Sequence, residues 1–180
     1  MLAERYKQYP HVEIINAAVC VEPGPKTFYL SKMEGHIDNM ASSSLFEVSE
    51  AYRKNGPRNQ VHTKQVITVN GVNMMQFLSE RGITHIDTYI SDAEGFDFSI
   101  LKTIQSLTDS KRIRTIQVET EPDYVQVEQR SGQPMNKSWM FLDLLIENYD
   151  LVGMQKGNYD WNSDTHWFNR DLEFCVKSDS

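Results

Sequence analysis

Several features that would fix a function at once are missing from this sequence of 180 residues. None of its nine glycines forms a Gly-x-Gly turn, and no P-loop, HExxH or GxSxG pattern occurs. The chain has only two cysteines, Cys20 and Cys175, and no Cys or His pair has the spacing of a zinc site. We therefore expect no metal centre of that kind. We interpret both cysteines as buried free thiols in a reducing compartment, which favours a cytoplasmic location.

Long apolar and long basic runs are also absent. No stretch approaches the 18 apolar residues of a membrane-spanning helix, and the polar start MLAERYKQYPH does not resemble a signal peptide. The formal net charge of −7 disfavours binding to phosphate backbones. We therefore expect neither a membrane segment nor a nucleic-acid partner.

What is present suits one folded domain. Hydrophobic residues make up 39% of the chain, and eight Phe, eight Tyr and three Trp can supply a core. We expect a single domain over residues 1–180, with an irregular insertion or loop at 33–64 that is rich in Ser, Asn, Gly and charge. A loop of this length in a compact domain is usually functional or mobile.

Strand-like and helix-like segments alternate along the chain. An apolar run over Val12–Val21 predicts a strand buried on both faces. The other expected strands are Lys26–Ser31, Val66–Val69, Ile83–Ser91, Arg112–Glu119, Asp150–Gln155 and Asp171–Val176. The expected helices are Val72–Arg81, Phe98–Leu107 and Lys137–Tyr149. This order predicts an α/β fold with a mainly parallel sheet that ends in an antiparallel C-terminal strand pair.

Acidic side chains gather where two of the expected strands end. Asp92, Glu94 and Asp97 follow the strand Ile83–Ser91, and Glu119 and Glu121 follow the next one. In open α/β sheets, ligands bind outside the carboxyl ends of the strands, so these residues would share one crevice.

The acids allow several roles. Together they could bind a metal, hold a polyhydroxylated ligand or share a proton at a raised pKa. Asp92 could also cap the following helix, Glu94 and Asp97 could complement its dipole, and the two later acids could be solvated. From the irregular segment, His36 could reach the crevice.

The segment Ile86–Gly95, with the sequence IDTYISDAEG, resembles the strand end of FkbM-family methyltransferases. A helix follows it, and the next strand ends in Ile116-Gln117-Val118-Glu119, in the same order as in that family. The resemblance covers roughly residues 12–177. It implies a Rossmann-like class I methyltransferase fold and transfer of a methyl group from S-adenosylmethionine (SAM).

The resemblance also implies roles for individual residues. The acceptor would be a hydroxyl of a sugar or a related small molecule. Asp92 would lie beside both the methyl donor and the acceptor oxygen, as base or hydroxyl orienter, with Glu94 in the same crevice. Asn16 and Ala17 would lie on the adenine side of the cofactor. Asp97, Glu119, Glu121 and His36 are the candidates for binding substrate.

Three departures from the family pattern bear on activity. Ile90 stands where the family has Lys, Asn70 stands where it often has Asp, and no glycine-rich cofactor turn occurs. We therefore expect an N-terminally incomplete fold: part of a longer protein, a rearranged sheet, or a sheet that a partner chain completes. Two alternative functions stay open. One is a non-catalytic binding module, and the other is a hydrolase with Mg²⁺ or Mn²⁺ held by Asp92, Glu94, Glu119 and Glu121.

Overall fold

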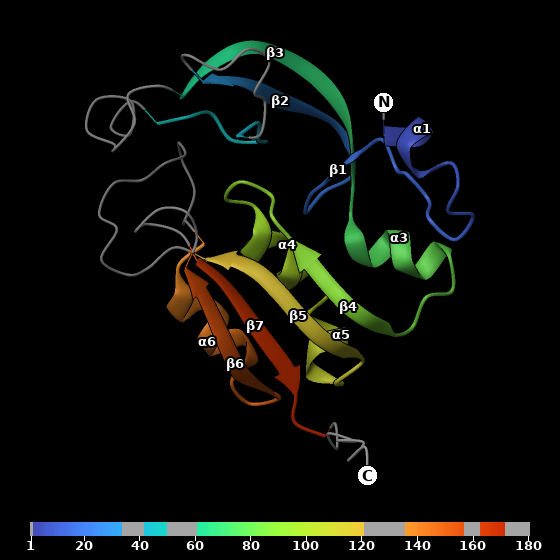
Figure 1. The fold of residues 1–180 in the computed structure, drawn as a ribbon, viewed down its shortest axis with the longest axis vertical. Coiled ribbons are helices and arrows are strands. Elements are labelled where there is room, and N and C mark those ends of the chain that lie inside the picture. The colour runs from blue at the N-terminus through green and yellow to red at the C-terminus, as the bar shows by residue number, and fades with distance from the viewer. Residues whose placement is uncertain (1, 34–41, 50–60, 121–135, 157–162, 172–180) are drawn as a thin grey trace.

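The computed structural model describes residues 2–33, 42–49, 61–120, 136–156 and 163–171. These residues form a mixed α/β protein with two mixed sheets, one above the other in the view of Figure 1. The first sheet has the order β1 (Ala18–Val19), β3 (Val61–Val72) and β2 (Gly24–Met33). The second has the order β4 (Ile86–Ser91), β5 (Ile113–Thr120), β7 (Ser163–Asn169) and β6 (Tyr149–Lys156). The helices are α1 (Leu2–Tyr6), α3 (Met74–Glu80), α4 (Asp97–Thr103), α5 (Gln105–Asp109) and α6 (Ser138–Leu145).

The first sheet is mainly a long antiparallel pair. β2 and β3 pair from Gly24 opposite Gly71 to Met33 opposite Val61, with one irregularity after Leu30. β1 joins the other edge of β3 in parallel, through two residues only. Gly71 is required where the three strands meet, because a Cβ atom there would lie 2.7 Å from Cys20 Sγ.

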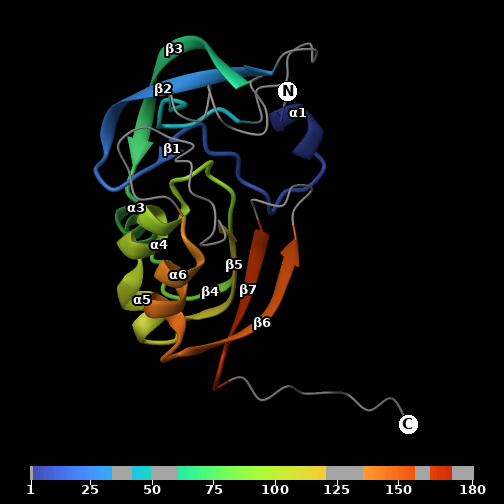
Figure 2. The same cartoon turned by 90° about the vertical axis from the view of Figure 1, so that its left-hand side faces the viewer.

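The second sheet has its helices on one face, as Figure 2 shows for α4, α5 and α6. Side chains of β5 alternate between the two faces, so Ile116, Val118 and Thr120 are buried. Trp167 lies opposite Ile116 in the register and is also buried. The Tyr149 hydroxyl donates to the Ile113 carbonyl at 2.8 Å, which satisfies its polar group inside the core.

The expectation of one mainly parallel sheet is not met. In the second sheet β4–β5 is parallel, whereas β5–β7 and β6–β7 are antiparallel. The last two described strands, β6 and β7, pair antiparallel, but β7 is Ser163–Asn169, a segment where the sequence predicted no strand, and the strand expected over Asp171–Val176 stays a prediction. The periodicity of β7 explains the difference: its buried residues Thr165, Trp167 and Asn169 alternate with half-buried ones, and polar residues on both faces hide this pattern in the sequence. Residues 172–176 lie outside the described part.

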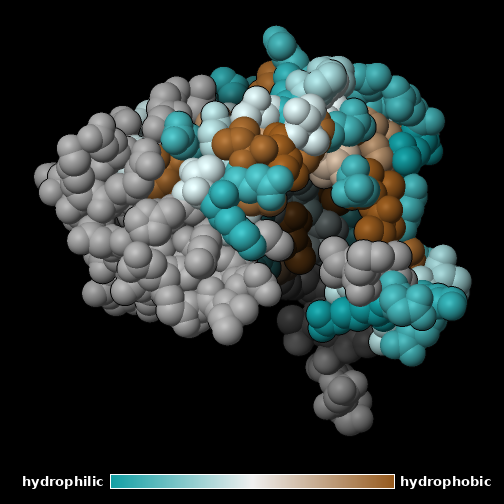
Figure 3. Space-filling model, turned by 90° about the horizontal axis from the view of Figure 1, so that it is seen from above, coloured by the Kyte–Doolittle hydropathy of each residue, from teal (hydrophilic) through white to brown (hydrophobic). Residues whose placement is uncertain are grey.

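The prediction of a doubly buried strand over Val12–Val21 is wrong. Only Ala18 and Val19 form a strand, and Val12, Ile14 and Ile15 are 38%, 41% and 40% exposed. Among the described strands, β1 pairs with β3 alone, and none pairs with residues 12–15. The face seen in Figure 3 shows hydrophobic residues at the surface between polar ones.

The segment 33–64 is only partly described. Residues 61–64 belong to β3, which has twelve residues where the sequence predicted a strand of four. Residues 42–49 lie along the first sheet, where Ser44 pairs with Tyr29. No described helix is long and apolar enough to cross a membrane. The cytoplasmic location and the single domain over 1–180 stay predictions.

Candidate functional site

A strained turn follows β4. The strand ends at Ser91, and the chain turns over Asp92–Phe96 into α4. Glu94 has a φ of 51° and Gly95 a φ of 97°. Glycine adopts such angles freely, whereas a residue with a Cβ atom is destabilised by roughly 1–2 kcal/mol. The surroundings must therefore hold Glu94 in this conformation. Strained backbone conformations of this kind are common at functional sites.

Residues 42–49 provide part of that hold. The Ser44 hydroxyl donates to the Glu94 carbonyl at 3.0 Å. The Ser44 backbone meanwhile exchanges two hydrogen bonds with Tyr29 of β2, at 2.8 and 3.1 Å. The rings of Phe46 and Phe96 lie 4.7 Å apart. This segment thus links the first sheet to the turn after β4.

Asp97 holds the turn from the other side. Its side chain is fully buried and accepts hydrogen bonds from the Ser91 hydroxyl, from Ala93 N at 3.0 Å and from Asn136 Nδ2 at 2.6 Å. Burial raises the pKa of Asp97, and these donors partly offset that effect. The carboxylate predicted to bind substrate therefore contacts groups of the protein itself.

A cavity of about 330 Å³ lies between β1, the end of β4 and the turn. Its wall is mostly apolar, with a few polar side chains from β4, the turn and residues 42–49. The lining residues are Ala18, Val19, Phe28, Ser43, Leu45, Met74, Tyr89, Ile90, Ser91, Asp92, Ala93, Phe96 and Ile100. The volume falls in the range of small-molecule pockets.

Asp92 is the charged residue on this wall. Its pKa is raised, first by partial burial and then by the nearby carboxylates of Asp97 and Asp164. A raised pKa makes a carboxylate a stronger proton acceptor when it is ionised. The direction of the shift is therefore the one that a general base requires.

Tyr89 was missed by the sequence reasoning. It lies two residues before Ser91 on β4, and its side chain is only 5% exposed. Its hydroxyl has no hydrogen-bond partner among the described residues. Burial and the Asp97 carboxylate raise the pKa of Tyr89, and the nearby Ser91 hydroxyl acts in the opposite direction. A tyrosine two positions before the end of a predicted strand was the signal available in the sequence.

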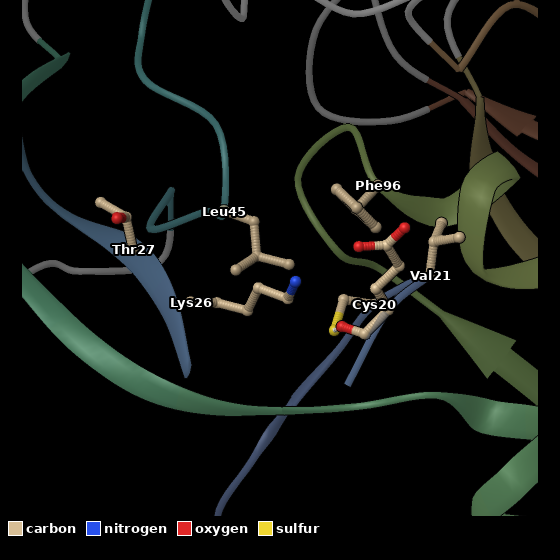
Figure 4. A pocket seen from close by; sticks show the side chains of 7 residues that line it. Cys20, Val21, Lys26, Thr27, Leu45 and Phe96 are labelled. Carbon is tan, nitrogen blue, oxygen red and sulfur yellow. Dashed lines mark hydrogen bonds between the residues drawn. The ribbon is translucent and has the colours of Figure 1, made fainter. Parts of the chain in front are cut away.

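A second cavity, of about 340 Å³, shares Leu45 and Phe96 with the first (Figure 4). Cys20 and Lys26 also line it, and the Lys26 side chain extends toward Leu45 and Cys20. Cys20 is buried, as predicted, and its thiol donates to the Glu22 carbonyl at 2.9 Å. Burial raises the pKa of this thiol, and the charge of Lys26 offsets part of the effect. Cys175 lies outside the described residues.

The other predicted residues are not in the first cavity's wall. Asn16 is exposed and Ala17 half-buried, and the wall includes the next two residues along the chain instead. Glu94 contributes its carbonyl to the contact with Ser44. Glu119 lies opposite Asp164 in the register of β5 and β7. His36 and Glu121 fall outside the described part of the chain.

Metal binding was the basis of one alternative function. Among the described residues, no three His, Cys, Asp or Glu side chains are placed so that they could hold a metal ion.

The described residues thus define a mixed α/β protein with an apolar cavity and a carboxylate at the end of a parallel strand. The model of the methyltransferase FkbM domain matches residues 3–150, and the chain belongs to this family. This confirms the resemblance found in the sequence. The comparisons with curated proteins and with solved structures gave no significant match.

Proposed function

We propose that this chain is a SAM-dependent methyltransferase that acts on the hydroxyl of a small-molecule or glycan acceptor. Membership of the FkbM family supports methyl transfer. The observation that carries the proposal is Asp92, a carboxylate of raised pKa on the wall of a cavity at the carboxyl end of β4. This is the position at which open α/β sheets bind their ligands.

The residues of the cavity fit the reacting end of SAM. When bound, SAM supplies a methyl group on a positively charged sulfur. A carboxylate beside apolar side chains attracts such a cation, since the charge interaction strengthens where water is excluded. Asp92 would therefore contact the cofactor, and Asn16 and Ala17, just before the cavity wall, are proposed for the adenine side.

Asp92 would also handle the proton. We assign its carboxylate to accept the proton of the acceptor hydroxyl, which makes the oxygen a better nucleophile. Alignment of the reactants would supply the larger part of the acceleration, on the order of 7–11 kcal/mol at best. Glu94 is proposed to act in the same crevice, with Glu119, Glu121 and His36 contacting the acceptor. Asp97 would act indirectly, by fixing the turn through Ser91 and Ala93.

Asp92→Asn tests the role of the carboxylate. Methyl transfer from labelled SAM should fall by about 10²-fold or more, the usual contribution of a general base. Asp87→Asn is the matched control, since Asp87 is exposed on the same strand and outside the cavity wall. Equal turnover of Asp92→Asn and the unchanged chain, with both folded, would remove the proposed role.

A second candidate is a binding module that a partner strand completes. β4 is an edge of the second sheet in the described structure, and Ile90 on it is 65% exposed. The free edge of a strand presents unpaired backbone N–H and C=O groups, which a further strand can bind, so the open edge of β4 favours an added strand. Calorimetry with SAM separates the two candidates. Clear binding heat from the chain alone supports the enzyme, and no heat from the folded chain supports the module.

A further inference from the structure

Two side chains of opposite charge line the second cavity. Lys26 of β2 is half-buried, and Glu22, just before β2, is exposed. Among the described residues, neither side chain has an ion pair or a hydrogen bond with another residue. Both charges are therefore available to a ligand, which would not have to displace a partner within the protein.

The packing of Lys26 directs its charge into this cavity. A Cβ atom built on Gly71 would lie 2.7 Å from Lys26 Cγ, so the aliphatic stem of the lysine lies directly against that glycine of β3. From there the side chain extends toward Leu45 and Cys20 (Figure 4). Its charge opposes the rise in pKa that burial causes at the Cys20 thiol. The sheet thus holds the stem, and the ammonium group faces the cavity.

The two cavities adjoin. Leu45 and Phe96 line both of them, so one ligand that contacts this pair can reach both walls. The chain passes the two cavities in order, because residues 18–19 line the first and residues 20–22 line the second. Residues 16–17, proposed for the adenine side, come just before. A ligand laid along this segment would meet the Asp92 cavity second and the two opposite charges last.

SAM carries its chemical groups in the same order. Its adenosine is joined to the sulfonium, and a short carbon chain joins the sulfonium to an α-amino acid end with one carboxylate and one ammonium group. The charges of Lys26 and Glu22 complement such a zwitterion. A ligand group of a single charge sign would be attracted by one of these side chains and repelled by the other.

We propose that the second cavity holds the α-amino acid end of SAM, with Lys26 bound to its carboxylate and Glu22 bound to its ammonium group. This inference rests on the proposed function. It assigns residues that hold the cofactor in a chain that has no glycine-rich turn. It concerns binding, so it is measured without an acceptor and without turnover.

Two nucleosides separate this end of the cofactor from the rest. S-Adenosylhomocysteine carries the α-amino acid end, whereas 5′-methylthioadenosine has the same adenosine and a thioether but lacks that end. In calorimetry, the full chain should bind S-adenosylhomocysteine about tenfold more tightly or better, the effect of a charge-assisted contact. Equal affinities for the two nucleosides would overturn the proposal.

Three variants test the assigned residues. Lys26→Met keeps the stem against Gly71 and removes the charge, so it should weaken S-adenosylhomocysteine about tenfold and 5′-methylthioadenosine less than about twofold. Glu22→Gln, at an exposed site, should also weaken only the former, and it serves if Lys26→Met fails to fold. Lys102→Met, exposed on α4 and outside both cavity walls, should change neither affinity.

Two results with these variants would overturn the assignment. One is full affinity of Lys26→Met and Glu22→Gln for S-adenosylhomocysteine. The other is an equal loss of affinity for both nucleosides, since a contact to the amino acid end cannot affect a ligand that lacks it.

The outcome is distinguishable from that of the proposed function. Selective binding of S-adenosylhomocysteine without any methyl transfer would contradict the enzyme and leave this inference intact. Methyl transfer from SAM, with undiminished SAM affinity in Lys26→Met, would contradict this inference alone. A folded chain that binds neither nucleoside would contradict both.

Discussion

Asn136 Nδ2 donates a hydrogen bond of 2.6 Å to Asp97 Oδ2, and both side chains are buried. Asn136 Oδ1 in turn accepts from Phe98 N at 3.1 Å. This pair therefore joins Asn136, two residues before α6, to the first turn of α4, and through Asp97 to the turn after β4.

Removal of Asp97 should destabilise the fold. Asp97→Ala leaves the donors of Ser91, Ala93 and Asn136 without their acceptor, and hydrogen bonds to a charged group contribute roughly 1.5–3 kcal/mol. We expect the free energy of unfolding in urea to fall by about 3 kcal/mol, with Asp87→Ala, at an exposed site, as control. A loss below that of the control would show that Asp97 does not hold the turn.

Ser44→Ala tests the other anchor of the turn. It removes the contact of 3.0 Å between the Ser44 hydroxyl and the Glu94 carbonyl, which should lower stability by about 1 kcal/mol. The backbone pairing with Tyr29 remains, so residues 42–49 keep their place. Ser79→Ala, exposed on α3, should change the unfolding free energy by less than about 0.5 kcal/mol. The same loss in both variants would contradict a specific role for Ser44.

Gly71 in the first sheet and Gly153 in the second allow a matched test of steric fit. A methyl group at Gly71 would lie 2.7 Å from both Cys20 Sγ and Lys26 Cγ and 2.8 Å from the Gly24 carbonyl, whereas nothing lies within 4 Å at Gly153. Gly71→Ala should therefore destabilise the chain by about 1–3 kcal/mol, the usual cost of overpacking. Gly153→Ala should stay near neutral in thermal unfolding. Equal melting temperatures would show that β1 is not held against Gly71.

The raised pKa of Asp92 makes the free energy of unfolding depend on pH in a definite direction. The folded chain holds this proton to higher pH than the unfolded chain, so stability falls as the pH rises between the two pKa values and is then constant. Asp92→Asn should remove this dependence and leave stability at neutral pH equal or higher. Methyl transfer should rise with pH over the same interval, because a base must be ionised. A rate that falls through this interval would contradict a base at Asp92.

The site was predictable from sequence where a local pattern defines it. The strand before Asp92 ends at Ser91, as predicted. The next strand along the chain, which has Glu119 near its end, was predicted as Arg112–Glu119 and is β5 (Ile113–Thr120). An apolar run followed by acids and a glycine carries this information within ten residues. The left-handed φ of Gly95 also follows from its position in that turn.

The contacts that fix the turn could not be predicted from such local patterns. Ser44 and Glu94 are 50 residues apart, and Asp97 and Asn136 are 39 apart, so no periodicity links them. The exposure of Ile14 and Ile15 was missed for a related reason, because an apolar run is buried only where the tertiary structure supplies a neighbour. The length of β3 likewise follows from its pairing with β2 and not from its own composition.

Transfer of a labelled methyl group from SAM to hydroxyl compounds, phenols and sugars alike, tests the central claim most directly. The full chain and Asp87→Asn should transfer label to a hydroxyl at equal rates, and Asp92→Asn should do so about 10²-fold more slowly or not at all. Transfer by folded Asp92→Asn at the rate of the unchanged chain would contradict the account.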